Sequence, residues 1–231
     1  MSVELEHPAV FWLVATLAAY VVSRVVYHFA KSFLTSPLLL SCVLCLGLTM
    51  GLHTSYREYM RGGQWLLLLL GPATVAFALP IYEHRALLRK YWPTLAVGVG
   101  FGCILAFGGA WLMSGLLDLP RNVRLSVLPR SFTTPFAMAF AKDVGGAPDL
   151  AAVCVIATGI LGASVGGMLL KVLPLRCALA RGAMLGMGAH GAGVARAREI
   201  GDEEGAVAGL VMILAGVTCA LLGPAVALLQ S

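Results

Sequence analysis

The sequence carries little charge of either sign. Asp, Glu, Lys and Arg make up 12% of its 231 residues and 59% are hydrophobic, whereas soluble domains are about 25% charged. The mean hydropathy is +0.89. This balance excludes a disordered chain and a secreted disulfide scaffold. The formal net charge of +5 includes no basic cluster larger than Arg85, Arg89 and Lys90, so a nucleic-acid partner is not expected.

The sequence also lacks the residue patterns of common enzymes. It has no Ser/His/Asp arrangement, no glycine loop for a nucleotide and no cluster with metal-ligand spacing. Cys42 and Cys45 are spaced like a metal or redox pair, but they lie in an uncharged apolar stretch without a second pair, which favours buried structural thiols. We therefore expect no enzyme activity, no metal and no cofactor.

What the sequence does contain is long apolar runs. A helix needs roughly 20 apolar residues to cross a bilayer, and no Asp, Glu, Lys or Arg lies between Trp92 and Asp118. We predict an all-α polytopic membrane protein that forms one integral membrane domain over residues 1–231. Six transmembrane helices are expected, at Pro8–Tyr27, Phe33–His53, Gln64–Tyr82, Pro93–Leu117, Leu150–Leu170 and Gly205–Leu229.

Two further segments are membrane-like but irregular. Asn122–Lys142 contains arginines, hydroxyl residues and two prolines, and Arg181–Arg198 is rich in glycine with His190 inside it. Broken backbone at membrane depth is tolerated only where it is buried in protein or lines a cavity. We therefore predict that both segments are broken or re-entrant and that they carry the function.

A short repeat supports a transporter-like architecture. Pro72-x-x-x-Ala76-Phe77-Ala78 recurs as Pro135-x-x-x-Ala139-Phe140-Ala141, and a Pro-x-Leu-Ala sequence follows each copy. The repeat units cover approximately residues 64–117 and 122–172. If both irregular segments dip in and return, Lys and Arg concentrate on one side and the repeat is inverted, as in many secondary transporters. If they cross, the copies are parallel.

The first irregular segment predicts a helix, a break and a second helix. Thr133 or Thr134 is expected to cap the second helix, with Pro135 in its first turn. A helix N-terminus within the membrane favours an anion, and Arg130 is positioned to bind a carboxylate. With Ser131, these residues form one half of a predicted substrate site. The alternative is a proline kink from which Arg130 extends to the interface.

The second irregular segment predicts the other half of the site. Gly188, Gly191 and Gly193 permit an unwound turn with positive φ or a close approach of backbones. His190 is able to donate to a substrate or exchange a proton near neutral pH. The alternatives are an interhelical hydrogen bond for His190 and tight helix packing for the glycines.

Charged residues near this segment are candidates for coupling or gating. Arg196 and Glu199 have i,i+3 spacing and are expected to form a pair at its end. We place Arg181 and Glu204 in the same group. The alternative is a solvated helix end, in which Glu204 stabilises the start of the last span.

These motifs together resemble the bacterial LrgB/CidB family. The matching stretches are Ser36-Pro37-Leu38-Leu39, Pro72-Ala73-x-x-Ala76-x-Ala78-x-Pro80-x-Tyr82-Glu83, Leu128-Pro129-Arg130-Ser131-x-Thr133-Thr134-Pro135, Ala152-Val153-Cys154-Val155, and Ala180-Arg181-Gly182 through His190 and Glu199 to Glu204-Gly205. The family usually has Asn in place of Ser36 and commonly Lys in place of Arg130.

The resemblance implies two rival functions. One is a secondary transporter of small 2-oxo or 2-hydroxy carboxylates, of the pyruvate, glycolate and glycerate class. The other is a holin- or antiholin-like protein that modulates murein hydrolase export and autolysis with a small LrgA/CidA-type membrane partner. Both imply a multi-pass protein of the bacterial inner (plasma) membrane, in contact with lipid. We also expect a homodimer and leave H+ or Na+ coupling open, with His190 or Glu199 as its candidates.

Overall fold

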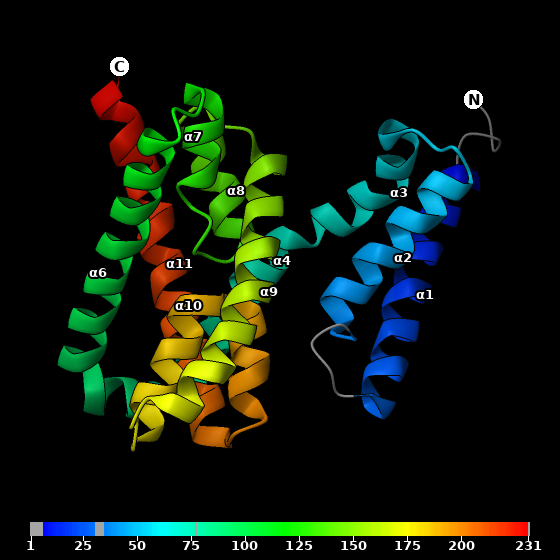
Figure 1. Ribbon diagram of the computed structural model, residues 1–231. Coiled ribbons are helices and arrows are strands. Elements are labelled where there is room, and N and C mark those ends of the chain that lie inside the picture. Colours follow the sequence, from blue (N-terminus) through cyan, green and yellow to red (C-terminus); the bar gives the residue numbers. More distant parts are fainter. Residues whose placement is uncertain (1–6, 31–34, 77, 231) are drawn as a thin grey trace. The chain divides into compact units, whose positions relative to one another are not determined.

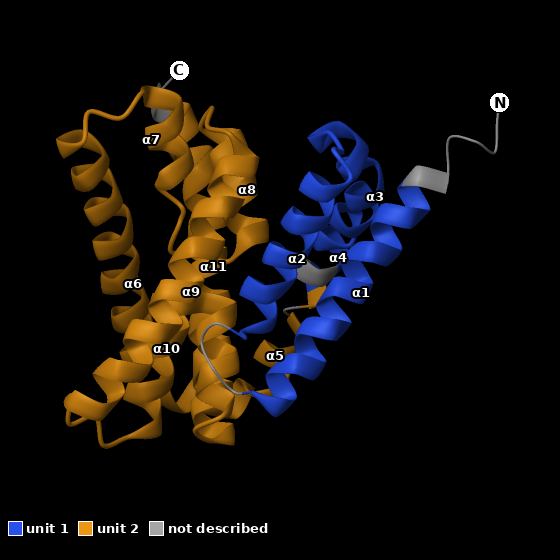
Figure 2. Cartoon of the chain, turned by 45° about the vertical axis from the view of Figure 1, so that its right-hand side comes forward, with its two compact units in different colours: residues 1–75 blue, residues 76–231 orange. Residues whose placement is uncertain are grey.

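The computed structural model describes residues 7–30, 35–76 and 78–230, and every regular element in these ranges is an α-helix (Figure 1). The chain forms two compact units, residues 1–75 and residues 76–231, which are coloured separately in Figure 2. Each unit is described by itself.

Unit 1 (residues 1–75) is built around the packing of its first and third helices. Its elements are α1 (His7–Phe29), α2 (Pro37–Gly51), α3 (Tyr56–Leu68) and most of α4 (Leu70–Ala76). A Cβ on Gly62 of α3 would lie 2.5 Å from the carbonyl oxygen of Ala9, so glycine allows the two backbones to touch. Trp12 meets Tyr59 edge to face at 5.5 Å.

A capping box begins α3. Ser55 accepts a hydrogen bond from the backbone of Glu58, and the Glu58 carboxylate accepts one from the Ser55 backbone. The hydrogen bonds from Ser55 hold the pKa of the Glu58 carboxyl below its ordinary value. This reciprocal arrangement satisfies two of the backbone donors that a helix N-terminus exposes.

Unit 2 (residues 76–231) is organised around its last helix. Its elements are α5 (Ala78–Glu83), α6 (Arg85–Leu116), α7 (Arg121–Val127), α8 (Thr134–Asp143), α9 (Pro148–Val172), α10 (Ala178–Arg198) and α11 (Asp202–Gln230). In the most apolar stretch of each long helix, 56% of residues are buried in α11, against 22% in α6 and 17% in α9. The helix α11 is therefore the centre of the unit, while α6 and α9 expose apolar faces.

The core of unit 2 joins α11 to α6 and to the α7–α8 segment. Val211 and Cys219 of α11 pack in one cluster with Val99 of α6 and with Phe132 and Phe140. The Phe107 ring of α6 lies 4.8 Å from Phe132 and 5.2 Å from Phe140. These contacts fix the α7–α8 segment against the long helices.

The structure supports a helical membrane protein with several spans. In the described residues, four helices are long and apolar enough to cross a bilayer: Ala9–Phe29, Arg85–Leu116, Pro148–Val172 and Asp202–Leu228. Each overlaps a span predicted from the sequence.

The other two predicted spans differ from the structure. The described helix α2 is shorter, at 15 residues, and residues 33 and 34 of the predicted Phe33–His53 lie outside the described ranges. Gln64–Tyr82 is not one helix, because α3 ends at Leu68 and α4 begins at Leu70. Pro72, in the first turn of α4, lacks the amide with which a continuous helix would bond back to Leu68. Phe77 of the predicted repeat also lies outside the described residues.

Candidate functional site

The helices α7 and α8 form a helical hairpin, called the first hairpin (residues 121–143). After α7 the chain turns, with the Arg130 amide donating to the Val127 carbonyl and the Phe132 amide donating to Pro129, at 3.1 Å each. It then returns, because the Ala147 amide just beyond α8 donates to the Ser126 hydroxyl of α7 at 2.7 Å. The turn therefore forms a tip, residues 128–133, far from the open end of the hairpin (Figure 1).

The tip of the first hairpin lies inside unit 2. Leu128, Phe132 and Thr133 are buried, and Arg130 is half-buried. The helix α8 begins after Thr133 with Pro135 in its first turn, as predicted, but the Thr133 hydroxyl makes no capping hydrogen bond. The side chain that should satisfy the first-turn amides of α8 therefore does not do so.

The helix α10 is a second hairpin (Ala178–Arg198). Its backbone is helical except at His190, where φ is 37° and ψ is −119°. The chain reverses there, and a Cβ on Gly193 would collide with the carbonyl oxygen of Leu185 in the preceding arm. The sequence predicts a break in this segment and offers the glycines as the residues with positive φ. In the structure the positive φ is instead at His190.

Glycines let the second hairpin approach its neighbours. Gly182 and Gly186 lie against the backbone of α11 at Glu204 and Ala208. Gly162 of α9 lies against the carbonyl of Gly188. Close packing, the alternative considered for these glycines, thus accounts for Gly193 but not for Gly188 or the exposed Gly191, where a Cβ would meet nothing within 4 Å.

The tips of the two hairpins meet at His190. Its side chain is 5% exposed, and its imidazole faces the backbone carbonyl of Arg130. The other side of the ring rests on α9, since a Cβ on Gly159 would lie 2.8 Å from Cε1. The imidazole Nε2 is buried and makes no hydrogen bond to any of the described residues. A buried polar atom without a partner is costly and is typical of a place where a ligand completes the bonding.

The charge around this junction is positive. The guanidinium of Arg130 is close enough to Cys154 of α9 to interact with it electrostatically. Residues 128–135 and 186–193 contain no acidic side chain. With the N-terminus of α8 at the same tip, the junction offers positive potential and donors to an anion.

The predicted coupling residues lie away from the tips. Arg181 at the start of α10 pairs with the buried Glu204 of α11 at 2.8 Å, and this pair joins the open end of the second hairpin to the last helix. Arg196 pairs with Glu199 at 2.5 Å, as the spacing predicts, and both are exposed. The structure therefore does not bring these four residues to the junction of the tips.

Two contributors on α9 are missing from the sequence-based site. Gly159 makes room for the imidazole, and Cys154 lies near Arg130. A signal for Gly159 exists, because Gly159, Gly162 and Gly166 mark one small-residue face of a long apolar helix. No sequence pattern connects Cys154 to Arg130, since the contact depends on how the hairpin docks.

Fold and site together define a polytopic helical membrane protein with a polar junction enclosed between two helical hairpins. The model of the LrgB-like family matches residues 16–229, and the chain belongs to that family.

The similar proteins include three from Bacillus subtilis (strain 168). The uncharacterized protein YwbG is 36% identical over 205 residues, covering 89% of this chain and 91% of the relative. The antiholin-like protein LrgB is 32% identical over 215 residues, covering 93% of each. The uncharacterized protein YxaC is 33% identical over 219 residues, covering 94% of this chain and 95% of the relative. No solved structure matches the chain.

Proposed function

We propose that this protein is a secondary transporter of small 2-oxo and 2-hydroxy carboxylates, of the pyruvate, glycolate and glycerate class. The observation that carries the proposal is the junction of the two hairpin tips. There the imidazole of His190 lies next to Arg130, and its buried Nε2 has no hydrogen-bond partner among the described residues. A protein that only perforates a membrane does not require such an enclosed polar junction.

The substrate carboxylate binds the first hairpin. Arg130 supplies a guanidinium that forms paired hydrogen bonds with a carboxylate, and the first turn of α8 adds backbone amides and the positive end of its dipole. Ser131, Thr133 and Thr134 add hydroxyl groups around the same tip. A small anion matches this donor set, whereas a cation would meet only like charge from Arg130.

The 2-substituent binds His190. A neutral imidazole has one donor and one acceptor nitrogen, so a keto oxygen accepts from Nε2 in one tautomer and a hydroxyl donates to it in the other. This versatility explains why one site would serve both 2-oxo and 2-hydroxy acids. Charge on the substrate also makes H+ or Na+ coupling reasonable, with His190 as the first candidate because Glu199 is exposed on the outer end of α10.

In this proposal both hairpins are re-entrant. The arms of each are too short to cross about 30 Å of hydrocarbon at 1.5 Å per residue. The open ends of the two hairpins lie at opposite ends of unit 2 (Figures 1 and 2), and each hairpin is followed by a long helix, α9 or α11. This match supports an inverted arrangement of residues 121–172 and 178–230. The repeat units predicted from the sequence, 64–117 and 122–172, remain a separate prediction.

The alternative function is control of autolysis, as a holin- or antiholin-like protein that works with an LrgA/CidA-type partner on murein hydrolase export. The observation that favours it is the name of the relative from Bacillus subtilis, the antiholin-like protein LrgB. Location in a bacterial inner membrane and a homodimeric state belong to both proposals.

Flux of radiolabelled pyruvate and glycolate into proteoliposomes tests the proposal. Wild-type protein should give saturable, selective uptake. Arg130→Ala should raise KM about tenfold or more, because a hydrogen bond to a charged group is worth about 1.5–3 kcal/mol. Arg130→Lys should retain part of the affinity, since lysine keeps the charge but not the fork of donors.

The matched control is Arg89→Ala, which removes an exposed arginine of α6. It should leave uptake unchanged. Wild-type-like uptake by both Arg130→Ala and His190→Ala would contradict the proposed site. Leakage of a large dye without selective uptake would favour the autolysis alternative.

A further inference from the structure

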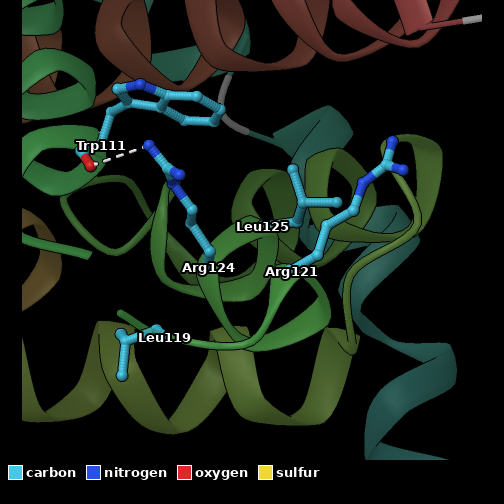
Figure 3. A pocket seen from close by; sticks show the side chains of 5 residues that line it. All are labelled: Trp111, Leu119, Arg121, Arg124 and Leu125. Atoms are coloured by element: carbon cyan, nitrogen blue, oxygen red, sulfur yellow. Dashed lines mark hydrogen bonds between the residues drawn. The ribbon is translucent and has the colours of Figure 1, made fainter. Parts of the chain in front are cut away.

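A cavity lies at the turn between α6 and α7, away from the hairpin tips. It has a volume of about 460 Å³ and is lined by Trp111, Leu119, Arg121, Arg124 and Leu125 (Figure 3). Three of these side chains are apolar and two are guanidinium groups, and no acidic side chain is among them. A cavity of this composition suits a ligand with an anionic group on an apolar body.

Arg124 is held in place for such a ligand. Its guanidinium carbon lies 3.5 Å from the centre of the Trp111 ring, and Nη2 donates to the Trp111 carbonyl at 3.3 Å (Figure 3). Gly115 of α6 lies beside the guanidinium, since a Cβ there would be in ordinary contact with Nη2 at 3.4 Å. These contacts fix the plane of the guanidinium before anything binds.

One nitrogen of this fixed group is unsatisfied. Arg124 Nε is buried and makes no hydrogen bond in the described part of the chain. The ring and the carbonyl hold one face and one end of the guanidinium, so the remaining donors are available to a planar or tetrahedral oxyanion. Arginine binds phosphate through two parallel hydrogen bonds.

The position of the cavity indicates that the oxyanion belongs to a lipid. It adjoins the end of α6, one of the candidate membrane spans, and Trp111 is half exposed, as expected of an aromatic residue at the membrane–water boundary. Leu112 and Leu116, in the same last turns of α6, are 60% and 70% exposed. Acyl chains attached to a bound phosphate would cover these side chains, whereas a free anion would leave them bare.

We propose that the Trp111–Arg124 cavity binds the phosphate of an anionic phospholipid. The guanidinium of Arg124 holds the phosphodiester, Trp111 and Leu125 contact the glycerol region, and the apolar end of α6 lies along the acyl chains. Basic pockets beside transmembrane helices bind anionic headgroups in this way. The site is separate from the hairpin tips, so it does not depend on the proposed transport of carboxylates.

Native mass spectrometry of the full chain tests this site. Delipidated protein is incubated with equal amounts of phosphatidylglycerol and phosphatidylcholine that carry the same acyl chains. Wild-type protein should retain phosphatidylglycerol preferentially. Arg124→Gln should reduce that preference by about tenfold, because the charge-assisted hydrogen bonds to the phosphate are lost. The control is Arg89→Gln, whose arginine is exposed outside the cavity; it should behave like wild type.

A second variant keeps both arginines and fills the cavity instead. Leu119→Trp should also reduce lipid retention, so the proposal stays testable even if Arg124→Gln does not fold. Unchanged retention in Leu119→Trp together with unchanged retention in Arg124→Gln would overturn the proposal, as would an equal loss in Arg89→Gln. Excess inorganic phosphate should not displace the lipid, and displacement would assign the cavity to a free anion.

Discussion

Three unusual features occur together at His190. It is buried, it lies at the reversal of the second hairpin with φ of 37°, and its Nε2 makes no hydrogen bond in the part of the chain that the structure describes. A non-glycine residue in this backbone region costs on the order of 1–3 kcal/mol. Glycine would adopt the same turn without strain, and three glycines occur within three residues of it. The strain and the bare nitrogen together argue that the imidazole is retained for a ligand.

Two substitutions at this position separate fold from function. We predict that His190→Gly is more stable than His190→Ala by about 1 kcal/mol, because both remove the imidazole but only glycine relieves the backbone. Thermal unfolding of the two purified variants in detergent measures the difference. Equal stability would show that the positive φ carries no strain. Both variants should lose pyruvate uptake, and uptake by His190→Gly would argue against a role for the ring.

At the residue scale the sequence identified more of the first hairpin than of its surroundings. Thr133 and Pro135 are recognisable as a helix start from local chemistry alone, and the structure agrees. The contact of His190 with Gly159 and the neighbourhood of Arg130 and Cys154 are not local. They depend on docking of helices distant in sequence, which no single pattern encodes.

At the scale of the helices, the most prominent contacts are those in which a glycine lets two backbones touch. The second hairpin contacts the backbone of α11 through Gly182 and Gly186, and Gly162 of α9 contacts the backbone of the hairpin. Gly166 of α9 instead makes room for the Leu185 side chain. Such small-residue contacts are typical of membrane helices, where burial from water contributes little to association. These contacts pack the second hairpin, with His190 at its tip, closely against α9 and α11.

A pair of glycine substitutions tests this packing. Gly186→Ala puts a Cβ against the Ala208 backbone and should destabilise the protein by about 1–3 kcal/mol, the usual cost of overpacking. The control is Gly209→Ala on α11, where a Cβ would meet nothing within 4 Å. This substitution should leave the free energy of unfolding unchanged or raise it. Thermal unfolding in detergent compares them, and equal melting temperatures would contradict the close contact.

Helix breaks were predictable from local residues, whereas chain reversal after each break was only one of two alternatives that the sequence left open. Proline, glycine and hydroxyl residues mark a break wherever they interrupt an apolar run, and both breaks occur in the segments so marked. Whether a chain continues or turns back after a break depends on one or two dihedral angles. At His190 these angles send the second arm against the first, which the surrounding glycines permit but do not specify.

At the scale of the molecule, the low charge of the sequence defines the class of protein. Four long apolar helices in the described residues agree with predicted spans, because uncharged runs are the strongest signal that a membrane imposes on a sequence. The predicted span Gln64–Tyr82 is wrong as a single helix, because the chain breaks between α3 and α4 just before Pro72, and hydropathy does not register a proline as a break. Division of the chain into units of residues 1–75 and 76–231 has no clear marker in composition.

Cysteine labelling from each side of the membrane tests the re-entrant arrangement. On an otherwise Cys-less background, Asn122→Cys and Ala147→Cys flank the first hairpin, whereas the native Cys177 and Ile200→Cys flank the second. All four positions are exposed. We predict that 122 and 147 react from one side and that 177 and 200 react from the other. If either segment crosses the bilayer instead, its two flanking positions will react from opposite sides.

Equilibrium binding of pyruvate to the purified protein addresses the central claim, that the two hairpin tips form a carboxylate site. Titration calorimetry in detergent compares wild type with His190→Ala and with His28→Ala, which removes an exposed histidine of α1. We predict equal Kd values for wild type and His28→Ala, and binding about tenfold weaker for His190→Ala, because the hydrogen bond between the buried imidazole and the 2-substituent of pyruvate is lost. Equal affinity in all three proteins, or no binding to wild type, would contradict it.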